Sequence, residues 1–176
     1  MPLSSSAPHV PPPAGLRRFL LSHPAHFIAL GFGSGLSRVA PGTVGTAWGW
    51  LAYLMLQAWL TPAAIGIVIA VSLVVGWWAC TVSARHMGVA DPGSIVWDEV
   101  VAIWIVLWLA MPMGFWGQLA AFALFRYFDA AKPGPVRWAD SCFKGFGWRG
   151  GFGILFDDLV AAFCTLLVIA LWRWFW

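Results

Sequence analysis

The acidic residues of this chain are few, and their pattern can do chemistry. There are seven of them, in order Asp91, Asp98, Glu99, Asp129, Asp140, Asp157 and Asp158. Two adjacent pairs stand near the starts of apolar runs, and one acid ends another run, so a helical bundle can bring five carboxylates to one place. Oxygen-rich groups without His or Cys suit a hard divalent cation such as Mg²⁺, which also binds substrate phosphates. The predicted Mg²⁺ ligands are Asp98, Glu99, Asp129, Asp157 and Asp158.

Structural ion pairs are the alternative account of the same acids. Arg126 precedes Asp129 by three residues, the spacing of an ion pair along one helix face, and Lys132 follows closely. If a metal is bound, Arg126 and Lys132 are instead the cations that offset negative charge developing on a phosphate. Spacing alone leaves both accounts open.

A glycine-rich stretch offers a second place for an anion. It begins at Ser34 and reads SGLSRVAPGTVG. Its hydroxyl groups and its backbone N–H groups can bind a phosphate. The alternative is a tight turn that lets helices pack closely, and the residues do not decide between the two. The predicted phosphate-binding residues are Ser34, Ser37, Arg38, Thr43, Arg126 and Lys132.

The elements that must position these residues are helices in a membrane. Of 176 residues, 61% are hydrophobic and 10% are charged, and the mean hydropathy is +0.80, which excludes a soluble domain with a charged surface. The predicted fold is all-α, an integral membrane helical bundle of about five helices, the third and fourth short for full spans. The apolar runs are Thr43 to Leu60, Ala63 to Val82, Ile95 to Ala110, Gly114 to Phe128 and Ile154 to Trp176. An extra partial helix over Ala25 to Gly35 is left open.

The chain is predicted to form one domain with a tail. Residues 1–22 begin with a proline-rich polar stretch, which predicts a disordered cytoplasmic tail, and residues 23–176 form a single helical membrane domain. Fourteen tryptophans fit the enrichment of aromatic residues at the headgroup level of a membrane. The three cysteines are widely spaced and indicate neither a disulfide nor a zinc site.

Charge is distributed unequally between the two faces of the predicted bundle. Alternating spans place all seven acids and nine of the ten lysines and arginines on one side, and Arg173 alone on the other. The positive-inside rule makes the charged face cytoplasmic. In this arrangement Asp157 and Asp158 lie within about the first turn of the last helix, where the helix N-terminus favours negative charge.

A cation-coupled transporter or channel is the competing class, because intramembrane acids also bind coupling cations. That class predicts polar residues deeper in the spans and often an internal repeat. The middles of the apolar runs contain almost nothing more polar than Ser72, Gln118 and Thr165, and no repeat is evident. The sequence therefore favours an enzyme that works at the membrane surface.

Four motifs in order carry a resemblance to a known family. They read GFGSGLSRVAPGTVGT, DPGSIVWDEV, RYFDAAKPGPVRWAD and GGFGILFDDLVA, spread over about residues 25 to 162. In these motifs the chain resembles the phosphatidylglycerophosphatase A family. The resemblance implies a multi-pass, Mg²⁺-dependent phosphatase of the bacterial inner membrane, which removes the terminal phosphate of phosphatidylglycerophosphate to give phosphatidylglycerol. The implied catalytic positions are Asp98, Glu99, Asp129, Lys132, Asp157 and Asp158.

Departures from the family pattern fall outside these charged positions. The stretch SCFKGFGWR lengthens the segment between the KPxP and GGxGI motifs, Gly134 replaces an aromatic residue and Ala162 replaces a glycine. The resemblance and the apolar composition together imply the partners, which are the lipid substrate of the family and membrane lipids, with no nucleic acid.

Overall fold

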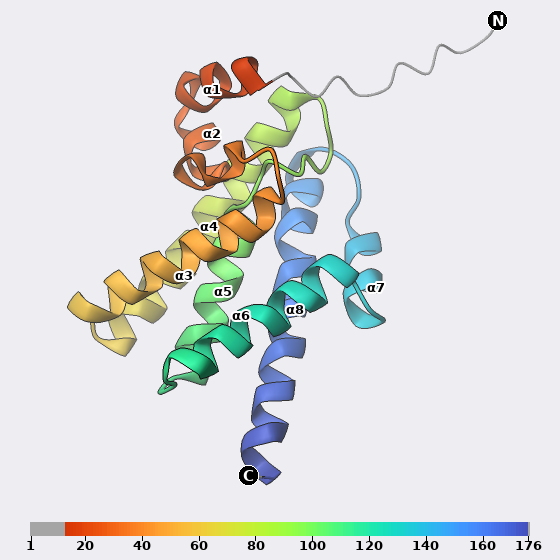
Figure 1. Ribbon diagram of the computed structural model, residues 1–176. Coiled ribbons are helices and arrows are strands. Elements are labelled where there is room, and N and C mark those ends of the chain that lie inside the picture. The colour runs from red at the N-terminus through yellow and green to blue at the C-terminus, as the bar shows by residue number, and fades with distance from the viewer. Residues whose placement is uncertain (1–12, 176) are drawn as a thin grey trace, which may run out of the picture.

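The computed structural model describes residues 13–175, and every regular element in that range is a helix (Figure 1). In chain order the elements are α1 (Pro13–Ser22), α2 (Pro24–Ala29), the short 3-10 helix η1 (Gly31–Leu36), α3 (Pro41–Trp59), α4 (Pro62–Met87), α5 (Trp97–Ala110), α6 (Phe115–Ala131), α7 (Pro135–Cys142) and α8 (Gly147–Phe175). The prediction of an all-α fold is confirmed.

Five of these helices occupy the five apolar runs of the sequence, namely α3, α4, α5, α6 and α8. Within residues 13–175, α4 and α8 are long and apolar enough to cross a membrane. By contrast, α5 has 14 residues, and a helix of that length rises about 21 Å, less than the hydrocarbon core of about 30 Å. The two long helices are compatible with a membrane protein, and a bundle of five spans stays a prediction.

The N-terminal segment differs from the predicted disordered tail. Residues 1–12 of that tail lie outside the described residues, but residues 13–22 form α1. The helix is amphipathic, because its spacing buries Leu20 in the core and leaves Arg17 and Arg18 exposed. The partial helix left open before the first span is divided into α2 and η1.

The last helix begins earlier than the sequence suggested. α8 starts at Gly147, about two turns before the predicted position. Its glycines allow it to lie close to α4, because a Cβ on Gly151 would come within 1.9 Å of the Oγ1 of Thr81. Asp157 and Asp158 therefore lie roughly 15 Å along the helix, and their predicted place in its first turn is wrong. The helix dipole acts within the first turn, so it does not account for these charges.

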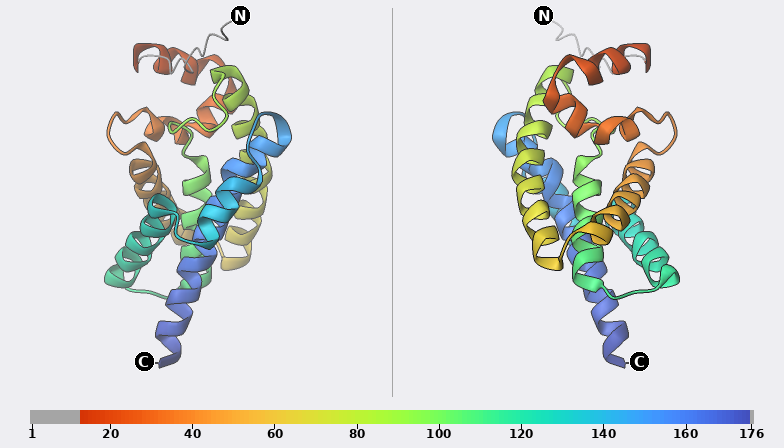
Figure 2. Two further views of the ribbon diagram at one scale, coloured as in Figure 1. Left: turned by 90° about the vertical axis from the view of Figure 1, so that its right-hand side faces the viewer. Right: turned by 90° about the vertical axis from the view of Figure 1, so that its left-hand side faces the viewer.

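α5 runs through the middle of the bundle, with α3, α4 and α8 packed against it (Figure 2). The side chains of Val100 and Ile103 are fully buried. Gly49 of α3 lets that helix approach, because a Cβ there would lie 3.0 Å from the Cα of Val100. This packing holds the first turn of α5, which contains Asp98 and Glu99, between its neighbours.

Tryptophans of α5 join helices by hydrogen bonds. Each of three indole N–H groups donates to a backbone carbonyl of another helix. The pairs are Trp97 to Ser72 at 3.0 Å, Trp104 to Gly49 at 2.7 Å and Trp108 to Pro62 at 2.9 Å. Part of the high tryptophan content thus connects helices, in addition to the enrichment at the membrane surface that the composition fits.

The polar ends of several helices lie together (Figures 1 and 2). α4 ends, and α5 and α8 begin, toward the end of the molecule where α1 and α2 lie, whereas α8 carries the C-terminus to the opposite end. There Arg173 donates to the carbonyl of Ala110 and, at 3.2 Å, to that of Pro112. α4 thus runs opposite to α5 and α8, and the predicted sidedness of the chain stays a prediction.

Candidate metal centre and active site

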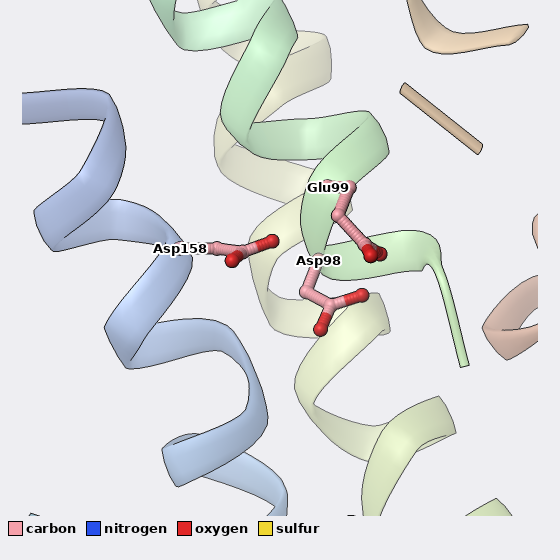
Figure 3. A group of neighbouring side chains, drawn as sticks. All are labelled: Asp98, Glu99 and Asp158. Carbon is pink, nitrogen blue, oxygen red and sulfur yellow. The ribbon is translucent and has the colours of Figure 1, made fainter. Parts of the chain in front are cut away.

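Three carboxylates from two helices meet inside the bundle (Figure 3). Asp98 and Glu99 come from the first turn of α5, and Asp158 comes from α8. One oxygen of each lies within 4.8 Å of the others. Direct packing of α5 against α8 positions these three groups, which are called the acidic cluster below.

Each carboxylate of the acidic cluster has a buried oxygen without a hydrogen-bond donor among the described residues. The atoms are Asp98 Oδ1, Glu99 Oε2 and Asp158 Oδ2. Leaving a buried polar atom unpaired costs about 1–3 kcal/mol, and more for a charged one, while the like charges also repel one another. A cation held between the carboxylates removes both costs. The acidic cluster therefore fits a metal ion, and its all-oxygen donor set is of the kind that hard cations prefer.

Arg126 and Asp129 form an ion pair beside the acidic cluster. Both lie near the end of α6, and Arg126 Nη1 donates to Asp129 Oδ2. The same nitrogen lies 3.8 Å from Glu99 Oε1 and 3.4 Å from the Oγ1 of Thr46. The Nε of Arg126 is buried and has no acceptor within the described chain. The ion pair that spacing suggested is thus present. The Nε–H of Arg126 takes no part in it and can donate to an oxygen from another molecule.

The first turn of α3 closes this side of the site. A Cβ on Gly42 would lie 2.3 Å from Glu99 Oε1 and 3.2 Å from both terminal nitrogens of Arg126. Thr46, one turn later, donates its hydroxyl to the carbonyl of Gly42 at 2.8 Å. Only glycine leaves the room that brings α3 against this carboxylate and this guanidinium.

Lys132 joins Asp157 to a second group of ion pairs. Its Nζ donates to Asp157 Oδ2 at 2.6 Å and to Asp140 Oδ1 of α7 at 2.5 Å, and Lys144 lies 2.9 Å from the same Asp140 oxygen. Burial alone would lower the pKa of Lys132, but the hydrogen bonds to Asp140 and Asp157 outweigh it and raise that pKa. Burial alone would raise the pKa of Asp140, but the bonds from Lys132 and Lys144 outweigh it and lower that pKa. Lys132 is therefore held as a charged ammonium group.

Asp157 and Asp158 have different partners although they are adjacent. Successive residues of a helix point about 100° apart. Asp157 turns to Lys132, whereas Asp158 turns to the two carboxylates of α5. Of the five expected metal ligands, the acidic cluster contains three, and the other two carry the ion pairs described above.

The glycine-rich stretch contributes unevenly to this region. Ser34 and Ser37 donate their hydroxyls to backbone carbonyls of their own turns, at 2.9 and 2.8 Å. Arg38 is exposed, and Thr43 lies half-buried in the first turn of α3. No contact found in the described part of the chain joins Ser34, Ser37 or Arg38 to the acidic cluster. Both serine hydroxyls are therefore bonded within the turn, and the predicted binding of phosphate by this stretch stays a prediction.

Sequence reasoning missed three residues at the site, namely Gly42, Thr46 and Asp140. Gly42 and Thr46 are four residues apart, so the sequence GTVGT already placed them on one helix face. Asp140 follows Lys132 by eight residues and returns to it because the chain turns into α7. No local periodicity signals that return.

Comparison with known proteins decides the family. Residues 27–173 match the family described as Phosphatidylglycerophosphatase A. The chain belongs to the phosphatidylglycerophosphatase A family. The acidic cluster and the ion pairs of Arg126 and Lys132 all lie within the matched range, and the resemblance inferred from four motifs is confirmed.

Two relatives in this family cover most of the chain. The phosphatidylglycerophosphatase A of Haemophilus influenzae is 42% identical over 161 residues, which are 90% of this chain and 95% of that protein. The phosphatidylglycerophosphatase A of Escherichia coli K12 is 41% identical over 145 residues, which are 82% of this chain and 80% of that protein. No solved structure matches the chain.

Proposed function

We propose that this family member is a phosphatidylglycerophosphate phosphatase, which hydrolyses the terminal phosphate monoester to give phosphatidylglycerol in phospholipid biosynthesis. The observation that carries the proposal is the acidic cluster, whose buried oxygens have no protein donor in the described range, in a chain of this family. The names of the relatives supply the reaction, and the carboxylates with their neighbouring cations supply a site for a phosphate ester.

The cofactor proposed for the acidic cluster is Mg²⁺, held by Asp98, Glu99 and Asp158. When bound, Mg²⁺ polarises phosphoryl oxygens and makes a bound water more acidic. The three carboxylates hold and orient the ion, and their position at the crossing of α5 and α8 keeps them at a constant separation. Asp129 and Asp157 were also expected as ligands. In this proposal they hold the side chains of Arg126 and Lys132 instead.

Arg126 and Lys132 are proposed to bind the phosphoryl oxygens and to offset negative charge that develops during hydrolysis. Asp129 and Asp157 hold these cations through ion pairs, so neither side chain has to be ordered when the substrate arrives. The buried Nε of Arg126 has no acceptor among the described residues, which supports this role because a phosphate oxygen is an acceptor for a guanidinium N–H.

The protein is proposed to cross the bacterial inner membrane several times, with residues 23–176 as one domain. Large apolar side chains are exposed on separate helices, for example Met55 of α3, Val74 of α4, Trp116 of α6 and Leu171 of α8. Lipid covers such side chains in a membrane, whereas soluble monomers rarely expose large apolar patches. This exposure supports embedding of α3 and α6 beside the two longest helices.

The active site is proposed to face the cytoplasm. The charged segments contain nine of the ten lysines and arginines, and the positive-inside rule places such segments in the cytoplasm. A lipid phosphate lies at headgroup level, which is where the first turn of α5 is expected. A cation-coupled transporter is less well supported, because both relatives that cover most of the chain are named phosphatidylglycerophosphatase A.

Phosphate release from phosphatidylglycerophosphate by the detergent-purified protein tests this function. We expect release with Mg²⁺ and none with EDTA, and restored release when excess Mg²⁺ is added back. The proposal would be contradicted if protein that shows a cooperative thermal unfolding transition, and is therefore folded, releases no phosphate with Mg²⁺.

A further inference from the structure

A cavity of about 480 Å³ near the polar end of the bundle has no role in the mechanism above. Its walls come from α1, from the turn between η1 and α3, and from the loop between α4 and α5. Ser37, Arg38, Asp91 and Ser94 are its polar lining, and the remaining lining is mostly apolar. Binding sites for small molecules have this size and this mixture of groups. The cavity is called the headgroup pocket below.

The headgroup pocket adjoins the acidic cluster. Pro41 lines the pocket, and the next residue, Gly42, lies against Glu99 at the distance given above. Asp91 lines the pocket as well, and it lies 4.0 Å from Lys144, which contacts the same oxygen of Asp140 as Lys132 does. The pocket therefore lies beside a residue that contacts the acidic cluster and beside the ion pairs of Lys132.

Arg38 is the cation of the headgroup pocket. It is exposed, and the described residues include no ion-pair partner for it. The carboxylate of Asp91 lies 4.0 Å from Lys144, which offsets its negative charge. Because a guanidinium binds two phosphate oxygens at once, the pocket suits a phosphate at Arg38 and a hydroxyl donor at Asp91.

We propose that the headgroup pocket binds the glycerol phosphodiester of the lipid substrate through Arg38, while the terminal phosphate lies at the acidic cluster. The inference rests on the proposed function, because the proposed substrate has two phosphates separated by one glycerol. The free hydroxyl of that glycerol lies between the two phosphates and can donate to Asp91. The diester is retained in the product, so phosphatidylglycerol also binds here. Arg38 is thereby a specificity-determining residue, which separates this substrate from lipids that have a monoester only.

The test is Arg38→Gln, with Arg137→Gln as the matched control that removes an exposed arginine of α7 outside the pocket. For Arg38→Gln we expect KM for phosphatidylglycerophosphate to rise about 10-fold, because one charge-assisted contact to the substrate is lost. We expect kcat to stay nearly unchanged. Inhibition by a short-chain phosphatidylglycerol should weaken by a similar factor. Binding of a short-chain phosphatidic acid, which has a monoester and no diester, should stay unchanged.

A direct binding titration keeps this test independent of turnover. If the wild type releases no phosphate, the proposed function fails, and the titration with phosphatidylglycerol still decides the role of Arg38. Equal affinity of wild type and Arg38→Gln for phosphatidylglycerol would overturn the inference. So would an equal loss of affinity in Arg137→Gln, because that result indicates general attraction to anionic lipid.

Discussion

Replacing Asp158 with Asn distinguishes a metal centre from an ion-pair network, and Asp157→Asn is the matched control. Asn keeps the size of the side chain and removes its charge. Asp158 Oδ2 has no donor among the described residues, whereas Asp157 Oδ2 accepts from Lys132 at 2.6 Å. Without metal, the two variants are therefore expected to change the free energy of unfolding in opposite directions.

The size of the effect follows from the spacing of the carboxylates. Two charges at the 4.8 Å limit of the acidic cluster repel by about 3.5 kcal/mol at an effective dielectric constant of about 20. Asp158→Asn relieves its repulsion with both neighbours, and protons taken up by the wild type already relieve part of it. We expect the free energy of unfolding in EDTA to rise by on the order of 1–3 kcal/mol. Asp157→Asn removes a charge-assisted hydrogen bond and should lower it by about 1.5–3 kcal/mol.

Added Mg²⁺ should reverse the order of the wild type and Asp158→Asn. A ligand at 100 times its dissociation constant stabilises the folded state by about 2.7 kcal/mol, and the variant should gain much less. Its phosphate release should fall about 10- to 100-fold or more. Asp157→Asn should keep the stabilisation by Mg²⁺. Thermal unfolding in detergent, with EDTA and with increasing Mg²⁺, measures these shifts beside phosphate release.

Two results would refute this reasoning. A wild type that gains no stability from Mg²⁺ would show that the acidic cluster holds no such ion. A loss of stability in Asp158→Asn in EDTA would show that a protein cation neutralises Asp158 and that the carboxylates do not destabilise one another.

The remaining predictions concern the ion pairs, the sidedness and the substrate. At pH 7, Asp140→Asn should lower the free energy of unfolding by about 1–2 kcal/mol, because Lys132 and Lys144 lose an acceptor. The pKa of Asp140 is lowered in the folded protein, so this difference should disappear as pH falls below about 4, as melting curves at several pH values would show. On a cysteine-free background, Ser141→Cys should react with an impermeant thiol reagent from the cytoplasmic side only, and Thr61→Cys from the opposite side only; reaction of both from one side would contradict the assigned topology. Activity assays should show strong preference for a phosphate monoester anchored in micelles, and equal kcat/KM on soluble glycerol phosphate would argue against a lipid enzyme.

The helices and their order were predictable because apolar runs, prolines and glycines are local signals. α3, α4, α5 and α6 lie where the runs of the sequence placed them. The starts of α1 and α8 were not predictable in the same way, because polar residues and glycines at both places become helical through packing. Gly151 of α8, for example, is tolerated because it admits the side chain of Thr81. Tertiary contact there outweighs low helix propensity.

The candidate site was predictable in composition and only partly in arrangement. The grouping of acids at helix ends indicated a shared site, and the structure brings Asp98 and Glu99 to Asp158. No local pattern separates Asp157 from Asp158, because the rotation of α8 relative to α5 decides which of them faces the cluster. Asp140 was not among the predicted site residues for a related reason, since only the turn after α6 brings it to Lys132.

The three indole hydrogen bonds of α5 limit how this enzyme can admit a lipid. A slip of α5 by one residue would move each indole by about 1.5 Å along the axis and about 100° around it, away from the carbonyls of Ser72, Gly49 and Pro62. Within a bilayer no water replaces the lost partners. We therefore expect α5 neither to slide nor to rotate during turnover, so that its two carboxylates keep a constant depth. We expect any gate for substrate and product to be formed by elements outside these three bonds, such as α6, which ends at the capping residue Lys132, and α7, which contains Asp140.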